Sequence, residues 1–248
     1  MNIDFPKQAD YPGLKALWAE AFGDEESFIE LFFSTGFSPE RCRCIWEKGE
    51  ILAALYWFDC EADGRKLAYL YGIATAKAQQ GKGLCRALMA DTHDLLPAQG
   101  FAGTVLVPAD PGLFAMYKKM GYSPICCTGS ISCAADGCCD IRRATPEEYA
   151  AARNALLPAG AVRQKQGLSF LSGYTELYTG RDFVLAGSRK ENAFTAMELL
   201  GNSNAAPAIL GALGLEKGTF RTPGNYPFAM YRPLSDAPAP TYFGLAFD

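Results

Sequence analysis

A glycine-rich junction between an apolar strand and an apolar helix is the feature that most constrains this chain. Residues 66–75 are predicted to form a strand, which runs into Gly81-Lys82-Gly83, and a helix is predicted to follow at once. Glycines at such a junction let backbone N–H groups converge without obstruction from a Cβ atom, and the positive end of the helix dipole lies beside them. The junction therefore favours a phosphate site.

Two widespread phosphate-binding motifs do not fit this junction. Gly81-Lys82 is not followed by Ser or Thr and has no glycine five residues before it, which excludes a Walker A loop. The third glycine of a dinucleotide-binding fingerprint is also missing. A Gly-x-Gly pair at a strand–helix junction can bind phosphate or can simply allow a tight turn. The surrounding sequence is therefore needed to choose between a phosphate site and a structural turn.

The surrounding sequence resembles the GNAT N-acetyltransferase superfamily. Residues 80–85 (Gln-Gly-Lys-Gly-Leu-Cys) are similar to its pyrophosphate-binding motif Gln/Arg-x-x-Gly-x-Gly/Ala, with Cys85 where Gly or Ala is usual. Further along, residues 113–122 resemble the second signature of the family, an aromatic-rich helix that ends in Tyr-x-x-x-Gly-Phe/Tyr. The two signatures occur in the family's order, and the resemblance covers about residues 1–125.

The resemblance implies acetyl-coenzyme A as the co-substrate and no metal. Its cofactor-binding positions fall on Ile73, Ala74 and Thr75, whose strand N–H groups would polarise the thioester carbonyl, and on Gln80, Gly81, Lys82, Gly83, Leu84, Cys85 and Arg86, which would hold the pyrophosphate. Cys85 matches a position that faces the pyrophosphate, so a route through a Cys85 acyl-enzyme is disfavoured against direct transfer in a ternary complex.

Tyr117 has two interpretations. It shares an apolar helix face with Leu113, Met116 and Met120, and this periodicity alone favours a core aromatic. The resemblance instead places Tyr117 near the coenzyme A sulfur as the general acid. No general base is evident, because the acidic residues of the first helices are interpreted as solvated charges.

The C-terminal half is similar in architecture to the enhanced-intracellular-survival type of acetyltransferase, in which a degenerate GNAT-like domain follows the catalytic one. The resemblance implies a catalytic domain over 1–140 and a degenerate domain over 141–248. In that group a terminal carboxylate reaches the active site. Here the apolar run Tyr242–Phe247 is predicted to be a strand of the second domain that brings a carboxylate of Asp248 to the mouth of the catalytic cleft.

Apolar periodicity predicts an α/β fold with a mixed sheet in the first domain and a smaller α+β unit after it. Asp110, followed by proline, predicts the start of the helix that carries Tyr117. His93 is predicted to lie on the solvent side of the helix after the glycines. The predicted helices start near Asp10, Ser27, Gly83, Asp110, Thr145 and Asn204, and the predicted strands span 3–5, 43–47, 51–58, 66–75, 104–107, 183–187, 195–200, 219–222, 228–232 and 242–247.

Composition excludes several classes of protein. The chain has 248 residues, of which 49% are hydrophobic and 12% aromatic, so it has the material for a core and is not disordered. A net charge of −4 without a basic cluster disfavours nucleic acid, and no apolar run or signal sequence indicates a membrane. An odd count of nine cysteines without Cys-x-x-Cys pairs disfavours both disulfides and zinc, which favours a cytoplasmic protein with free thiols.

The sequence therefore predicts an N-acetyltransferase that uses acetyl-coenzyme A and a small-molecule or peptide amine. Two alternatives stay open: a noncatalytic acyl-coenzyme A-binding or regulatory module, and a nucleotide-binding protein that uses the glycine-rich turn. The identity of the amine and the oligomeric state stay open as well.

Overall fold

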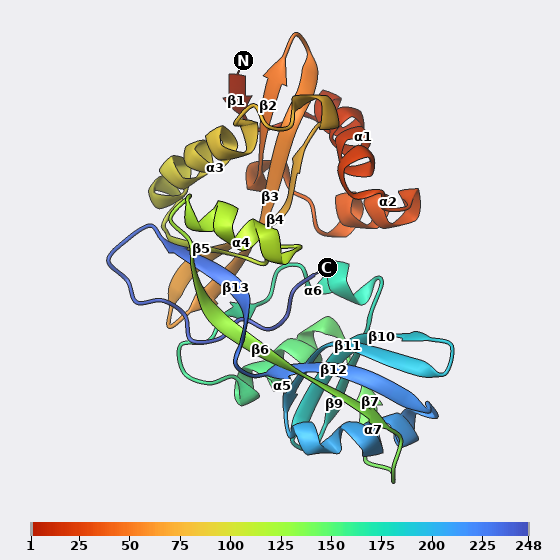
Figure 1. Cartoon of the computed structure of the whole chain (residues 1–248). Coiled ribbons are helices and arrows are strands. Elements are labelled where there is room, and N and C mark those ends of the chain that lie inside the picture. Colours follow the sequence, from red (N-terminus) through yellow and green to blue (C-terminus); the bar gives the residue numbers. More distant parts are fainter. Residues whose placement is uncertain (1, 248) are drawn as a thin grey trace.

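The computed structural model describes residues 2–247 and has two lobes that share one mixed sheet (Figure 1). The 13-stranded sheet has the order β1-β2-β3-β4-β5-β13-β6-β12-β11-β10-β9-β7, and β8 (Arg163–Gln164) pairs with β3 beside this path. The α/β fold with a mixed sheet that the sequence predicts is therefore confirmed.

The first lobe consists of β1 to β5 with helices on both faces. Its strands are β1 (Asn2–Asp4), β2 (Cys42–Glu47), β3 (Glu50–Ala62), β4 (Arg65–Thr75) and β5 (Phe101–Leu106), and its helices are α1 (Tyr11–Phe22), α2 (Glu26–Thr35), α3 (Leu84–Leu95) and α4 (Pro111–Lys118). Alternate residues of β3 point to opposite faces. Tyr56 and Phe58 pack in the cluster of α1 and α2, whereas Leu55 and Trp57 pack in the cluster of α3 and α4.

The second lobe repeats a strand–helix–strand crossover of the first. In the first lobe α3 connects β4 to the parallel strand β5, and in the second α7 connects β11 to the parallel strand β12. Its strands are β6 (Ser123–Ala134), β7 (Ile141–Arg143), β9 (Glu176–Gly180), β10 (Phe183–Lys190), β11 (Ala193–Gly201) and β12 (Lys217–Pro223), and its helices are α5 (Pro146–Leu156), α6 (Leu168–Ser172) and α7 (Ala206–Leu213).

Two long strands join the lobes. β6 runs from one lobe into the other, and β13 (Tyr226–Pro233) lies between β5 and β6 and pairs with both in antiparallel register. The sheet of the first lobe is thus continued by a strand that comes late in the sequence (Figure 1). A domain boundary at residue 140 stays a prediction.

The predicted strand at Tyr242–Phe247 is wrong, because this segment is irregular although it is buried. Its backbone carbonyls make hydrogen bonds outside any strand ladder. The Tyr242 carbonyl accepts from the Val162 N–H (2.8 Å), and the Leu245 carbonyl accepts from the Gln164 side chain (2.8 Å). The apolar pattern therefore signalled burial correctly, but side chains and loop amides satisfy the backbone in place of a neighbouring strand.

The predicted exposure of His93 is also wrong, since only 3% of the residue is accessible. Its Nε2 atom lies 2.8 Å from the Tyr122 hydroxyl, which in turn lies 2.7 Å from the Thr104 hydroxyl. Hydrophobic periodicity assigns polar residues to the solvent face, whereas this helix buries Thr92 and His93 by giving each a hydrogen-bond partner.

All nine cysteines are free thiols. Between residues 2 and 247, no group of three or more His, Cys, Asp or Glu side chains is placed to hold a metal ion. No helix in this part of the chain is long and apolar enough to cross a membrane.

Candidate functional site

A cleft opens where β4 and β5 separate. The two strands pair in parallel from Lys66 and Phe101 as far as Tyr69 and Val105, and β4 then continues to Thr75 with β3 as its only strand partner among the described residues. The cleft has a volume of about 650 Å³ and is lined on one side by residues 70–73 of β4 and on the other by Leu106 and the residues that follow it. The splay leaves one edge of β4 without a strand partner.

A bulge at Gly72 shapes the β4 side of the cleft. The register between β3 and β4 shifts there, and Gly72 has a φ of +58°. A Cβ atom at this position would lie 2.9 Å from the Trp18 ring and 3.0 Å from the Tyr56 ring, so both space and backbone conformation require glycine. The bulge brings Trp18 of α1 against the cleft wall.

The three predicted carbonyl-binding positions have different surroundings. Ile73 lines the cleft. Ala74 and Thr75 lie in register with Ala54 and Ala53 of β3, and the Ala74 side chain is buried in the core. The structure therefore brings Ile73 directly to the cleft, whereas Ala74 and Thr75 pair with β3 and do not line the cleft.

The glycine-rich loop leads straight into α3. Gly81 and Gly83 have φ values of +77° and +81°, and no heavy atom lies within 4 Å of a Cβ built at either position. Gly83 is the N-cap of α3, and no side chain caps the helix. The N–H groups of the first turn thus lack the usual side-chain partner, and the left-handed backbone, not crowding, is what requires glycine.

The other predicted pyrophosphate-binding residues surround this loop. Lys82 and Arg86 are exposed, and the Lys82 ammonium donates to the Gln79 side chain (2.8 Å). The Gln80 amide donates to the Thr75 carbonyl (3.3 Å), which ties the loop to the end of β4. Leu84 is buried, so it anchors the helix and leaves only its backbone for a ligand.

Tyr117 lies in the cleft wall and has a free hydroxyl. It is 6% exposed, and no residue between 2 and 247 makes a hydrogen bond with its hydroxyl. Burial, together with the nearby Cys85 and Asp110, raises the pKa of the phenol well above its ordinary value. α4 fixes the side chain, since Asp110 caps the helix by accepting from the Gly112 N–H (2.8 Å). Tyr117 is thus a protonated donor that faces the cleft.

Cys85 is half-buried in the same cluster of side chains. Burial raises the pKa of its thiol, which keeps the sulfur protonated near neutral pH. A protonated thiol is a poor nucleophile.

The C-terminal segment reaches the cleft. Phe247 lines it, and the Phe247 carbonyl accepts from the Tyr71 hydroxyl (2.9 Å) and the Tyr174 hydroxyl (2.8 Å). The Phe247 N–H donates to the Tyr69 hydroxyl (3.2 Å). Three tyrosines therefore hold the backbone N–H and carbonyl of Phe247, the last described residue. Asp248, the predicted base or anchor, lies outside the described residues.

A buried ion pair holds the start of the same segment. The Arg153 guanidinium donates to both carboxylate oxygens of Glu198 at 2.6 and 2.9 Å, and the two side chains are 1% and 0% exposed. The Tyr242 and Tyr149 hydroxyls donate to the same carboxylate at 3.0 and 3.3 Å. Sequence reasoning missed this network, although a glutamate within the apolar run of β11 was a signal for it.

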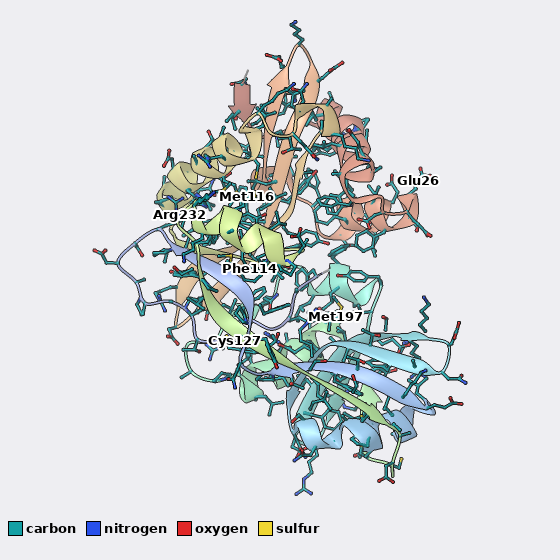
Figure 2. The ribbon with its side chains drawn as sticks, in the orientation of Figure 1. Glu26, Phe114, Met116, Cys127, Met197 and Arg232 are labelled. Atoms are coloured by element: carbon teal, nitrogen blue, oxygen red, sulfur yellow. The ribbon has the colours of Figure 1, made fainter. Side chains whose placement is uncertain are left out.

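The half of the cleft that faces α1, α2 and the second lobe was not predicted either. We define the outer half of the cleft by Trp18, Phe22, Asp24, Phe28, Tyr174 and Met197. Met197 of β11 lies where the two lobes meet (Figure 2). Glu26, by contrast, points away from the body of the first lobe on α2 and does not line the cleft (Figure 2). The dense run of aromatic residues between 18 and 33 was the available signal.

The family model described as an acetyltransferase (GNAT) domain matches residues 2–125, which contain the splayed strands, the glycine-rich loop and Tyr117. The chain belongs to the GNAT acetyltransferases. The family resemblance that the sequence suggests is thereby confirmed.

Solved structures extend this similarity over both lobes of the acetyltransferase. The GCN5-related N-acetyltransferase of Anabaena variabilis is 14% identical and has a TM-score of 0.74, over 94% of this chain and 72% of that one. That of Kribbella flavida is 17% identical with a TM-score of 0.69, over 94% and 70%. Eis1 of Mycobacterium abscessus is 14% identical with a TM-score of 0.67, over 94% and 74%. No curated protein matches the sequence.

Proposed function

We propose that this GNAT protein transfers an acetyl group from acetyl-coenzyme A to a primary amine by direct attack in a ternary complex. One observation carries the proposal: the unpaired edge of β4 and Tyr117 line one cleft, and the uncapped start of α3, which packs against β4, follows that strand in the chain. These are a hydrogen-bonding edge, an anion site and a proton donor, which are the groups that acyl transfer from a thioester needs.

Two sets of backbone N–H groups suit the pyrophosphate and the thioester of acetyl-coenzyme A. The N–H groups of residues 81–86 would hold the pyrophosphate, because glycine leaves their approach open and no side chain caps the helix. The N–H groups of Ile73, Ala74 and Thr75 would polarise the thioester carbonyl. Acetyl-coenzyme A supplies the activated acyl group.

The reaction needs two proton transfers. The amine gives up its proton, its nitrogen attacks the thioester carbonyl, the C–N bond forms and the C–S bond breaks. We assign to Tyr117 the proton that the leaving sulfur receives, because Tyr117 lines the cleft and its raised pKa keeps the phenol protonated before the transfer. The protonated thiol of Cys85 argues against a covalent acyl-enzyme.

We further propose that a carboxylate of Asp248 receives the amine proton or attracts a cationic substrate. The support is that Phe247, its neighbour in the chain, is fixed in the cleft by Tyr71 and Tyr174. Deletion of Asp248 should lower acetyl transfer and leave acetyl-coenzyme A binding unchanged, and Asp248→Asn should have the same effect only where the side-chain carboxylate is the group that acts. Full activity in the deletion variant would end this assignment.

The co-substrate site is tested with a matched pair of glycine variants. Gly83→Glu places an anion in the loop, whereas Gly100→Glu places the same side chain at a φ of +83° with equally open surroundings, away from the loop. Both carry a similar backbone cost of about 1–2 kcal/mol. Acetyl-coenzyme A should raise the melting temperature of the wild type and of Gly100→Glu but not of Gly83→Glu. An equal rise in all three proteins would refute the site.

Measuring the release of coenzyme A thiol distinguishes an acetyltransferase from a noncatalytic binding protein. Release of free coenzyme A thiol should depend on an added amine, with one acetylated amine formed for each thiol released. Binding of acetyl-coenzyme A without amine-dependent thiol release, over a panel of monoamines, polyamines, aminoglycosides and peptides, would favour a noncatalytic acyl-coenzyme A-binding module. Stabilisation by ATP and not by coenzyme A would favour a nucleotide-binding protein.

A further inference from the structure

A second cavity lies between the C-terminal end of α3 and the end of β13. It has a volume of about 550 Å³, and its lining shares no residue with that of the cleft. His93 lines it from α3, and Arg232 lines it from β13, on the opposite side of the first lobe from α1 and α2 (Figure 2). The cavity is therefore separate from the site proposed for acetyl transfer.

Arg232 has one free edge of its guanidinium group at this cavity. Its Nη1 group donates to the Met120 carbonyl (2.7 Å), and its side chain packs against Gly121. Between residues 2 and 247, the Nε and Nη2 groups have no hydrogen-bond partner, and no carboxylate forms an ion pair with Arg232. Two parallel N–H groups of this kind match the two oxygen atoms of a carboxylate or a phosphate.

The His93 imidazole lies at the same cavity. The residue is 3% exposed, and its Nδ1 atom has no hydrogen-bond partner in the described part of the chain. The other ring nitrogen, Nε2, lies 2.8 Å from the Tyr122 hydroxyl, which lies 2.7 Å from the Thr104 hydroxyl. One ring nitrogen is therefore bound within the core, and the other is left for a ligand.

The two hydroxyls indicate which ring nitrogen carries the hydrogen. Thr104 is 0% exposed and Tyr122 is 1% exposed, so each hydroxyl hydrogen needs an acceptor among these three side chains. If Thr104 donates to Tyr122 and Tyr122 donates to Nε2, both hydrogens are bonded and Nδ1 carries the ring hydrogen. The opposite direction leaves the Thr104 hydrogen buried without an acceptor, which is costly. Nδ1–H is therefore a second donor beside Arg232.

The charge inside the cavity favours an anion. Burial and then the positive charge of Arg232 lower the pKa of His93, whereas the carboxylates of Asp94 and Asp236 make no such contribution and are exposed to solvent. Asp94 and Asp236 line the outer part of the cavity, where they would repel a dianion such as phosphate about twice as strongly as a monoanion. The preferred ligand thus has a single negative charge.

The remaining walls suit an apolar body. Pro97, Pro233 and Leu234 also line the cavity. A volume of about 550 Å³ exceeds what a carboxylate group alone would fill, so these side chains can contact the rest of a small organic ligand.

We propose that this cavity is a second ligand site, which binds a small monoanionic carboxylate with an apolar body through the Arg232 guanidinium and the His93 Nδ1–H group. The site does not depend on the proposed acetyl transfer, and either proposal can fail alone.

NMR titration of the single histidine tests the ligand class. Benzoate is the probe, inorganic phosphate is the dianionic comparison, and benzamide has the shape of benzoate without its charge. Benzoate should shift the imidazole signal in a saturable way and bind at least about tenfold more tightly than either comparison, since hydrogen bonds to charged groups are the stronger ones. Equal binding of phosphate or of benzamide would overturn the proposal.

Nitrogen-15 spectra of the same imidazole test the geometry. Nδ1 should carry the hydrogen in the free protein, and benzoate should shift the Nδ1 signal more than the Nε2 signal. A hydrogen on Nε2, or an imidazole signal that does not respond to benzoate, would also overturn the proposal.

Three variants locate the anion. Arg232→Met should weaken benzoate binding by roughly 10–100-fold. Arg232→Lys keeps the positive charge if the first variant does not fold, and it should still weaken binding because an ammonium group lacks the two parallel donors. Arg221→Met is the matched control, since Arg221 is also half-buried and donates to one backbone carbonyl, that of Met197 (3.3 Å), but lies outside the cavity. Benzoate binding that the Arg232 variants weaken no more than Arg221→Met does would exclude the site.

Discussion

His93 should make the folded protein lose stability as the pH falls from 7 to 5. The buried imidazole lies beside the Tyr122 hydroxyl, and its Nδ1 atom has no hydrogen-bond partner among residues 2–247. Burial first, and then the positive charge of Arg232, lower the pKa of His93 from 6.5 to about 3. A proton on this ring would leave a buried cation close to another cation.

The sign of the effect follows from where the proton binds. In the unfolded chain the imidazole takes up a proton near pH 6.5, whereas the folded protein resists it until about pH 3. The contribution of His93 to stability is therefore complete above pH 6.5 and is lost as the pH falls towards 3. At pH 5 the loss is about 2 kcal/mol, and the whole difference corresponds to about 5 kcal/mol.

Thermal unfolding measures this loss. For a chain of this size, 2 kcal/mol lowers the melting temperature by about 4–8 °C between pH 7 and pH 5. His93→Gln is the matched variant, because its amide can replace the hydrogen bond to Tyr122 but does not titrate. The decrease between pH 7 and pH 5 should shrink by that amount in the variant, while carboxylates contribute equally to both proteins.

The chain contains one histidine, so a single imidazole signal reports on it by NMR. That signal should not shift between pH 8 and pH 5 in the folded protein. A titration near pH 6.5, or equal pH dependence of the melting temperature in wild type and His93→Gln, would refute the reasoning.

Three further changes test the site and its supports. Tyr117→Phe should lower kcat by about 10²–10⁴-fold with little change in acetyl-coenzyme A affinity, and wild-type turnover with chemistry rate-limiting would make Tyr117 a packing residue. Glu198→Leu should reduce the free energy of unfolding in urea by about 3–5 kcal/mol, because it leaves Arg153 buried and unpaired. Adding Arg153→Met should restore most of this loss, and a double variant as unstable as the single one would contradict the ion-pair argument. Cys85→Ala should keep acetyl transfer, whereas loss of activity with intact cofactor binding would favour the thiol route.

The first half of the fold could be predicted because its signals are local. Asp110 and the proline after it mark the start of α4, and the glycines at 81 and 83 mark the start of α3. Each of these signals depends on residues within one turn of the chain. The glycine-rich loop carries a local signal of this kind, whereas the periodicity around Tyr117 favours a core side chain and only the family resemblance indicates a role for it as the acid.

The parts that could not be predicted depend on contacts between distant residues. Asp24 lines the cleft together with Met197 of the second lobe, and the Trp18 indole N–H fixes the position of its carboxylate. The segment 242–247 has the apolar pattern of a strand, but the tyrosines and the glutamine that bind its backbone are far away in the sequence. The hydrophobic pattern of a segment indicates that it is buried, but it does not identify the residues that contact it.

The position of β13 has a consequence for synthesis of the chain on the ribosome. Until residues 226–233 have emerged, β5 and β6 present open edges to the cell, since β13 is the strand that fills the gap between them. Open strand edges invite pairing with other chains, so the nascent protein is expected to need chaperone protection late in translation. The same geometry makes residues 1–140 expressed alone prone to aggregation, and a separately supplied strand 226–233 should raise the solubility of this fragment by covering the open edge of β5.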